Sequence, residues 1–312
     1  MSDVRKAAVA GTWYPGSAAA LAAAVDGHLA AADSQGADLK GSLVALIAPH
    51  AGLMYSGPVA AHAYRLLRDR TFEVAVLVGP SHFVGFDGVS LYPSGGFATP
   101  FGVAPVDEDC ARAIAAASAI VHDDHPAIHA REHSLEMQLP FLERLAPSVP
   151  IVPLLMGYQT AETAAALGDA LAVALRGRRA LLIASTDLSH YHDAGTASAL
   201  DRVVIDCVTR LDPDGLQAAL DARPEHACGG GPTVAVMRAA RASGAQDAVI
   251  LNYADSGDVS GDKSSVVGYL AAAMGTFVKG PFVRGQTPYK VSDPLHTRCL
   301  TPYKTPYNPL QS

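Results

Sequence analysis

The sequence has few cysteines and no pairing pattern among them. The four cysteines are Cys110, Cys207, Cys228 and Cys299. Because they include no Cys-x-x-Cys pair, a zinc ribbon and a thioredoxin-type motif are excluded, and the scattered usage fits a reducing compartment. Any chemistry by cysteine must therefore come from one of these residues singly.

Basic residues and long apolar segments are also scarce. Lys and Arg total 23 against 30 Asp and Glu, which gives a net charge of −7, and no basic run occurs. This balance argues against a nucleic-acid-binding protein. No stretch reaches the roughly 20 apolar residues of a membrane span, and Trp13, Pro15 and Gly16 interrupt the N-terminus before a signal-peptide core can form. The sequence predicts a cytoplasmic protein without nucleic-acid or membrane partners.

Several common catalytic signatures are missing as well. The chain contains no P-loop, no Gly-x-Ser-x-Gly elbow and no Gly-x-Gly-x-x-Gly after an apolar run. P-loop nucleotide hydrolysis, α/β-hydrolase chemistry and simple Rossmann binding are therefore excluded. With 312 residues, 49% of them hydrophobic, the chain is long enough to bury a substantial core.

The apolar pattern alternates between strand and helix periods. Apolar runs predict strands at 43–48, 74–79, 87–93, 149–157, 180–187, 247–255 and 264–274. Helical spacing predicts helices at 17–31, 56–69, 107–118, 132–145, 160–175, 194–210, 212–221 and 231–243. Such alternation predicts an α/β fold with a largely parallel central sheet flanked by helices. From about residue 276 the periodicity ends, so we expect one domain over 1–275 and a disordered C-terminal extension over 276–312.

Polar side chains follow three of the predicted strands. His50 comes after the run at 43–48, His82 after the run at 74–79, and Asp187 and His190 at and beyond the end of a third. Ligand sites in open α/β sheets lie beyond the carboxyl ends of the strands. Two histidines from neighbouring strand ends, with one thiolate or carboxylate, would form a three-ligand site suited to iron, copper or zinc. Each histidine taken alone fits an ordinary strand cap or hydrogen bond equally well.

Cys228 is the candidate third ligand. It precedes three glycines and a predicted helix. Glycines let backbone approach a ligand closely, and the helix N-terminus would favour the thiolate form of the cysteine. The alternative is a small buried hydrophobic residue.

A competing motif lies at residues 129–133. The segment HAREH matches H-x-x-E-H, in which two histidines on a helix bind zinc and the glutamate acts as base. Three fixed positions arise easily by chance in a chain with 12 histidines, and no signature marks the further glutamate ligand that this motif needs. In the alternative interpretation, Glu132, His133 and Glu136 form the polar face of a helix over 132–145 whose leucines pack inward.

Seven motifs between about residues 7 and 274 resemble, in order, those of the Memo family. They are AGTWYPG, IAPHAGLMYSGPVAAHAY, VLVGPSHF, REHSLEMQLPFL, STDLSHY, ACGGGP and NYADSGD. The resemblance is to its bacterial and archaeal members, called AmmeMemoRadiSam system protein B. It implies a fold related to the class III extradiol dioxygenases, non-haem Fe(II) enzymes whose iron is held by two histidines and a glutamate. By motif, His50 and His82 match the histidine ligands, Cys228 replaces the carboxylate, and His190 matches a further pocket histidine.

The resemblance implies a metal-dependent redox enzyme or metal-binding protein, with Fe(II) the expected metal and copper the second. As an enzyme it would be a non-haem iron dioxygenase-like oxidoreductase, with His190 as a general base or a hydrogen-bond donor to oxygen, oriented by Asp187 or Tyr191. A thiolate in place of a carboxylate also fits a non-catalytic binding or adaptor protein that holds a metal, a small molecule or a peptide. The name of these family members further suggests radical-SAM and AMMECR-type proteins as partners.

Overall fold

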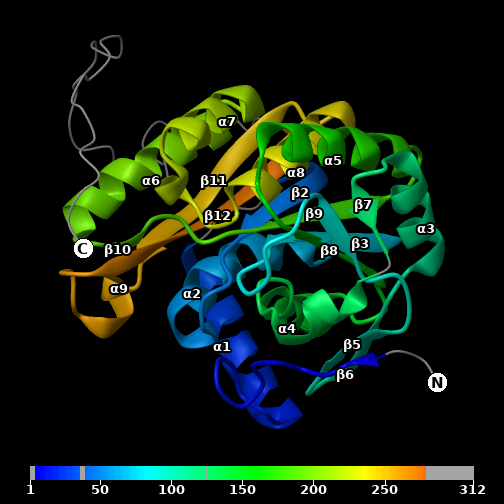
Figure 1. Cartoon of the computed structure of the whole chain (residues 1–312). Coiled ribbons are helices and arrows are strands. Elements are labelled where there is room, and N and C mark those ends of the chain that lie inside the picture. The colour runs from blue at the N-terminus through cyan, green and yellow to red at the C-terminus, as the bar shows by residue number, and fades with distance from the viewer. Residues whose placement is uncertain (1–3, 36–38, 124, 279–312) are drawn as a thin grey trace.

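A large mixed β-sheet runs through the molecule (Figure 1). The computed structural model describes residues 4–35, 39–123 and 125–278. Across the sheet the strands are, in order, β10 (His190–His192), β12 (Val266–Phe277), β2 (Gly41–Ala48), β9 (Ala180–Ser185), β3 (Val74–Pro80), β8 (Ile151–Met156), β4 (Val89–Leu91) and β7 (Val121–His122), with β11 (Asp247–Asp255) paired to β12.

Helices cover both faces of this sheet (Figure 1). One face carries α3 (Glu108–Ala117), α5 (Ala161–Ala174), α6 (Ala194–Thr209), α7 (Pro213–Ala222) and α8 (Gly230–Ala242). The other face carries α1 (Ala18–Gln35), α2 (Leu53–Tyr64) and α4 (Leu139–Leu145). Short helical segments connect these elements: η1 (Arg65–Leu67), η2 (Pro126–Arg131), η3 (Glu136–Gln138), η4 (Pro224–His226) and α9 (Gly257–Ser260).

The middle of the sheet is parallel, and antiparallel pairs join it to the strands on either side. β2, β9, β3 and β8 pair in parallel, and every residue of β3 and β8 is buried. Burial on both faces explains why these strands are continuous apolar runs in the sequence. β12 pairs antiparallel with β2, β11 and β10, and β4 pairs antiparallel with β8. At the far edge, β7 pairs in parallel with β4. The predicted α/β fold with a helix-flanked central sheet is confirmed, and its parallel part is centred on four strands.

Two local features differ from the sequence-based prediction. A small sheet of β1 (Val4–Arg5), β5 (Gly96–Thr99) and β6 (Gly102–Pro105) was not predicted. The predicted helix over 132–145 is wrong in its first half, because α4 begins only at Leu139. The Glu132 carboxylate accepts the backbone N–H groups of His133 and Ser134, and such local side-chain hydrogen bonds compete with helix formation.

The last strand extends slightly beyond the predicted domain boundary. β12 ends at Phe277, which pairs with Gly41, so residues 276 and 277 belong to the sheet. The remainder of the predicted C-terminal extension, 279–312, lies outside the described residues. Among the helices of the described ranges, none has the length and apolar character needed to cross a membrane.

Candidate metal centre

Three adjacent strands bring candidate side chains to one edge of the sheet. His50 lies two residues beyond β2, Asp187 two residues beyond β9, and His82 two residues beyond β3. β9 lies between β2 and β3 and is parallel to both. The carboxyl ends of the three strands therefore meet, at the edge where open α/β sheets bind ligands.

His50, His82 and Cys228 form a compact group. Each offers one ligand atom, and these atoms lie within 4.8 Å of one another. Nε2 of His50 is 3.2 Å from Sγ of Cys228. Metal–nitrogen bonds of about 2.0 Å and metal–sulfur bonds of about 2.3 Å separate neighbouring ligand atoms by roughly 3 to 3.6 Å. The observed separation thus fits two donors to one ion. His50 is buried and His82 has 28% of its side chain exposed, so the group opens to solvent beside His82.

A hydrogen-bond network fixes the tautomer of His50. Its Nδ1 lies 2.8 Å from Oγ of Ser185. That hydroxyl donates its hydrogen to the Ser134 carbonyl at 2.6 Å and accepts Nε2–H of Gln138 at 2.7 Å, so it can only accept from His50. Nδ1 therefore carries the proton, and Nε2 presents its lone pair to Cys228. Burial, with the charges of His82 and His133, holds the pKa of His50 well below its usual value, so the ring is neutral as a metal ligand must be.

Glu132 orients His82 in the same way. Its Oε1 accepts Nδ1–H of His82 at 2.9 Å, and its Oε2 accepts the backbone N–H of His82 at 2.6 Å. Burial raises the pKa of Glu132, but hydrogen bonds from His82 and Ser134 outweigh burial and lower the pKa to about 2. The ionised carboxylate keeps the proton on Nδ1 of His82 and the lone pair on Nε2. A carboxylate behind an imidazole is the usual support of a metal-binding histidine.

Glycine at position 229 allows Cys228 to approach the end of β9. A Cβ atom on Gly229 would lie 2.4 Å from the carbonyl oxygen of Ser185. The close approach that this glycine allows is therefore to the protein's own backbone and not to a ligand. The Cys228 N–H donates to the Asp187 carbonyl, and Gln159 donates to the Cys228 carbonyl at 2.7 Å. Burial and the nearby Asp187 carboxyl raise the pKa of Cys228. The expected bias toward thiolate is therefore wrong for the metal-free protein, and a bound cation is what would favour the thiolate.

His190 lies beside this group on β10. Its Nδ1 donates to the Leu188 carbonyl at 2.8 Å, which leaves the lone pair on Nε2. Burial lowers the pKa of His190, and the charge of His82 lowers it further. The Asp187 carboxyl accepts the backbone N–H of His50 at 2.7 Å, and burial raises its pKa to about 7. The Leu188 carbonyl thus orients His190, whereas the Asp187 carboxyl, which the sequence suggested for that part, holds the turn at His50. The ring of Tyr191 is 78% exposed and has its centroid 5.6 Å from that of His190.

The H-x-x-E-H segment does not form a helical zinc site. η2 ends at Arg131 and Glu132 is extended. The buried ring of His129 has its Nε2 3.1 Å from the Ser90 carbonyl, whereas the ring of His133 stacks on that of His82 at a centroid distance of 4.7 Å. The zinc-peptidase interpretation is therefore wrong. The polar-face interpretation is also wrong, because Glu132, His133 and Glu136 are buried.

His82, Glu132 and His133 form a second group with ligand atoms within 4.8 Å of one another. Oε1 of Glu132 already accepts Nδ1–H of His82 and the backbone N–H groups of His133 and Ser134. Its lone pairs are thus committed to the protein, and we assign Glu132 a supporting role. Sequence reasoning missed this support, together with Ser185, because no spacing along the chain links these residues to the histidines.

Comparison with known proteins places the chain in a family. A family model described as Memo-like protein matches residues 5–273. A MEMO1 family protein of Methanothermobacter thermautotrophicus is 42% identical over 278 residues, covering 85% of this chain and 98% of that protein. One from Nitrosopumilus maritimus is 34% identical over 272 residues, covering 86% and 98%. The crystal structure of an uncharacterized protein from Escherichia coli K12 has a TM-score of 0.53 at 18% identity, covering 75% of this chain and all of that one, and so shares the fold. The chain belongs to the Memo family.

Proposed function

We propose that the protein binds one metal ion through His50, His82 and Cys228 and acts as a metal-dependent redox enzyme. The observation that carries this proposal is the 3.2 Å separation of Nε2 of His50 and Sγ of Cys228. The networks behind His50 and His82 support it, because both leave a lone pair on Nε2. Imidazole and thiolate ligands suit iron, copper and zinc; Fe(II) is the first choice, from the family resemblance, and copper the second.

The surroundings of the group suit a substrate reaction. An ion with three protein ligands keeps open positions for substrate and supplies Lewis-acid or redox chemistry there. His190 is held with its Nε2 lone pair available and has a pKa lowered by burial, so it can accept a proton from a substrate hydroxyl. Trp13 and Phe83, 39% and 51% exposed, lie with ring centroids 4.3 and 5.9 Å from that of His133. A planar aromatic substrate would find stacking partners beside the ligands.

The second candidate is a metal-binding or adaptor protein without turnover. Cys228 supplies a soft sulfur donor where the related dioxygenases have a carboxylate, and soft donors favour Cu(I). In that case the same three residues bind the metal and His190 has no catalytic part. Radical-SAM and AMMECR-type partners and a cytoplasmic location stay predictions from the sequence.

Metal analysis tests the ligand set. Protein purified without air is loaded with Fe(II), Cu(I) or Zn(II), and bound metal is counted by mass spectrometry. We expect one ion per chain in the wild type and less than about a tenth of that in His50→Ala and Cys228→Ser. The matched controls are His122→Ala, an exposed histidine, and Cys207→Ser, a cysteine in α6. Full metal content in both ligand variants would refute the site.

Oxygen consumption separates the two candidate functions. The Fe(II)-loaded protein is mixed with a panel of catechols while dissolved O2 is followed. A redox enzyme consumes O2 only with its substrate, and His190→Gln, with its metal content intact, loses most of that consumption. Metal binding with no oxygen uptake across the panel favours the non-catalytic candidate.

A further inference from the structure

A second recess lies at the opposite edge of the same sheet. It has a volume of about 740 Å³ and is lined by the start of β2, the start of β9, the loop before β3, the turn after α5 and the end of α8. The ligands of the metal centre follow the other ends of β2 and β3, so the two sites are separated by the length of the strands. The volume lies within the roughly 300 to 1,000 Å³ of small-molecule sites.

The lining of this recess is cationic in a chain of net charge −7. No Asp or Glu occurs among the eighteen described residues that line it, and its charged side chains are Arg70, Arg176, Arg178 and Arg179. Arg178 donates to Asp107 at 3.1 Å and Arg179 to Glu73 at 3.2 Å. Within the described part of the chain, Arg176 has no ion-pair partner. The carbonyl ends of α5 and α8 offset some of this charge, so charge alone does not define the ligand.

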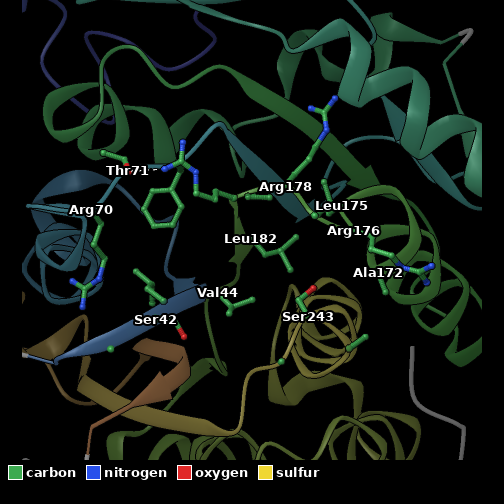
Figure 2. A pocket seen from close by; sticks show the side chains of 18 residues that line it. Ser42, Val44, Arg70, Thr71, Ala172, Leu175, Arg176, Arg178, Leu182 and Ser243 are labelled. Carbon is green, nitrogen blue, oxygen red and sulfur yellow. Dashed lines mark hydrogen bonds between the residues drawn. The ribbon is translucent and has the colours of Figure 1, made fainter.

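The middle of the recess is apolar. Figure 2 shows Val44 and Leu182 at its centre, with Arg70, Arg176 and Arg178 around them and directed away from one another. Because the guanidinium groups diverge, they do not form a cage for a small oxyanion. The central surface, extended by Phe72, would instead remove the apolar part of a ligand from water.

We propose that this recess binds an organic anion with an apolar body, of the class of medium-chain carboxylates. The acyl chain lies over Val44 and Phe72, which are partly exposed whereas Leu182 is buried, and the carboxylate reaches Arg176 at the rim. The arginine side chain suits this contact because its fork of N–H donors matches a carboxylate. The site does not depend on the metal centre.

Calorimetric titration of the full chain with octanoate, 1-octanol and acetate tests the two parts of the ligand separately. We expect saturable one-to-one binding of octanoate, binding of octanol at least about tenfold weaker, and no saturation by acetate. In Arg176→Glu, octanoate should bind about tenfold more weakly, or about 1.4 kcal/mol. Arg223→Glu is the matched control, since this exposed arginine pairs with Glu225 outside the recess and gives the same change in net charge.

A second variant, Phe72→Ala, tests the apolar surface and should weaken octanoate and octanol alike. His50→Ala should bind octanoate as the wild type does, so failure of the metal-site proposal leaves this one intact. The proposal is overturned by equal affinity for octanoate and octanol, by unchanged octanoate affinity in Arg176→Glu, or by the absence of saturable octanoate binding to the wild type.

Discussion

Replacing Glu132 by glutamine tests whether the carboxylate behind His82 supports a metal ligand. Its Oε1 accepts Nδ1–H of His82 and two backbone N–H groups, and its Oε2 accepts the backbone N–H of His82 at 2.6 Å. A glutamine oxygen can take the place of Oε1, but its NH2 group then faces the backbone N–H of His82. One part-buried donor loses its acceptor, and the imidazole loses its ionised partner.

Two effects of similar size, measured by different experiments, follow from this geometry. An unsatisfied buried donor lowers the free energy of unfolding by about 1 to 3 kcal/mol. Loss of the partner behind a ligating histidine weakens metal binding about 10- to 100-fold, which is about 1.4 to 2.8 kcal/mol of binding free energy. We expect Glu132→Gln to show both, the first by urea unfolding of the metal-free protein and the second by competition with a chelator.

Glu143→Gln provides the matched control. Glu143 is half-buried and hydrogen-bonded to Thr99 outside the candidate metal centre, so its replacement should leave metal affinity unchanged. If Glu132→Gln loses stability but keeps the metal affinity of the wild type, Glu132 does not support a ligand, and the assignment of His82 to the metal is wrong.

Three further predictions concern groups around the site and in the core. Ser185→Ala removes the acceptor of Nδ1–H of His50, so metal affinity measured by chelator competition should fall about tenfold; unchanged affinity would contradict the tautomer assigned to His50. Burial raises the pKa of Asp201. Because an aspartate in the unfolded chain has a pKa of about 4, the free energy of unfolding of the wild type falls as the pH rises above that value. Asp201→Asn should therefore gain stability relative to wild type as the pH rises from about 4 to 7.5 in urea titrations, whereas Asp26→Asn, at a carboxyl whose pKa Arg144 lowers, should be less stable than wild type by an amount that stays constant over this range. In a Cys299→Ser background, zinc should slow thiol labelling of Cys228 at least about tenfold, and equal rates with and without zinc would exclude Cys228 as a ligand.

The sequence predicted the parts of the fold that depend on periodicity. β3 and β8 are buried on both faces, and both are continuous apolar runs that can be recognised without a structure. His50 and His82 were found for the same reason, because each is a polar residue just beyond a buried strand. Cys228 needed the glycines beside it as a signal, and the structure gives each of them a packing role: Gly229 against the end of β9, Gly230 against Leu220 and Gly231 against Met156.

The parts that the sequence did not predict depend on contacts between distant segments. Leucines at helical spacing predicted a helix from residue 132, but Glu132 instead bonds to the backbone that follows it and to His82, 50 residues away. The two-residue strand β1 has no periodicity to detect, although its pairing with β5 fixes where the chain enters the fold. Hydrogen bonds between distant segments are specified by the folded geometry, so no local sequence pattern predicts them.

A buried ion pair, Arg5 with Glu136, links the N-terminal segment to the candidate metal centre. The Glu136 carboxylate is inaccessible to solvent and accepts from Arg5 at 2.6 Å, from the hydroxyl of Tyr14 at 2.7 Å and from two backbone N–H groups of the N-terminal segment. Burying an ion pair costs about as much desolvation energy as its attraction returns, so its effect is on geometry more than on stability. The pair positions Trp13 with its ring centroid 4.3 Å from that of His133, and it anchors the segment from which Glu132 supports His82. The geometry of the proposed ligands therefore depends on residues near the start of the chain that are not themselves proposed ligands.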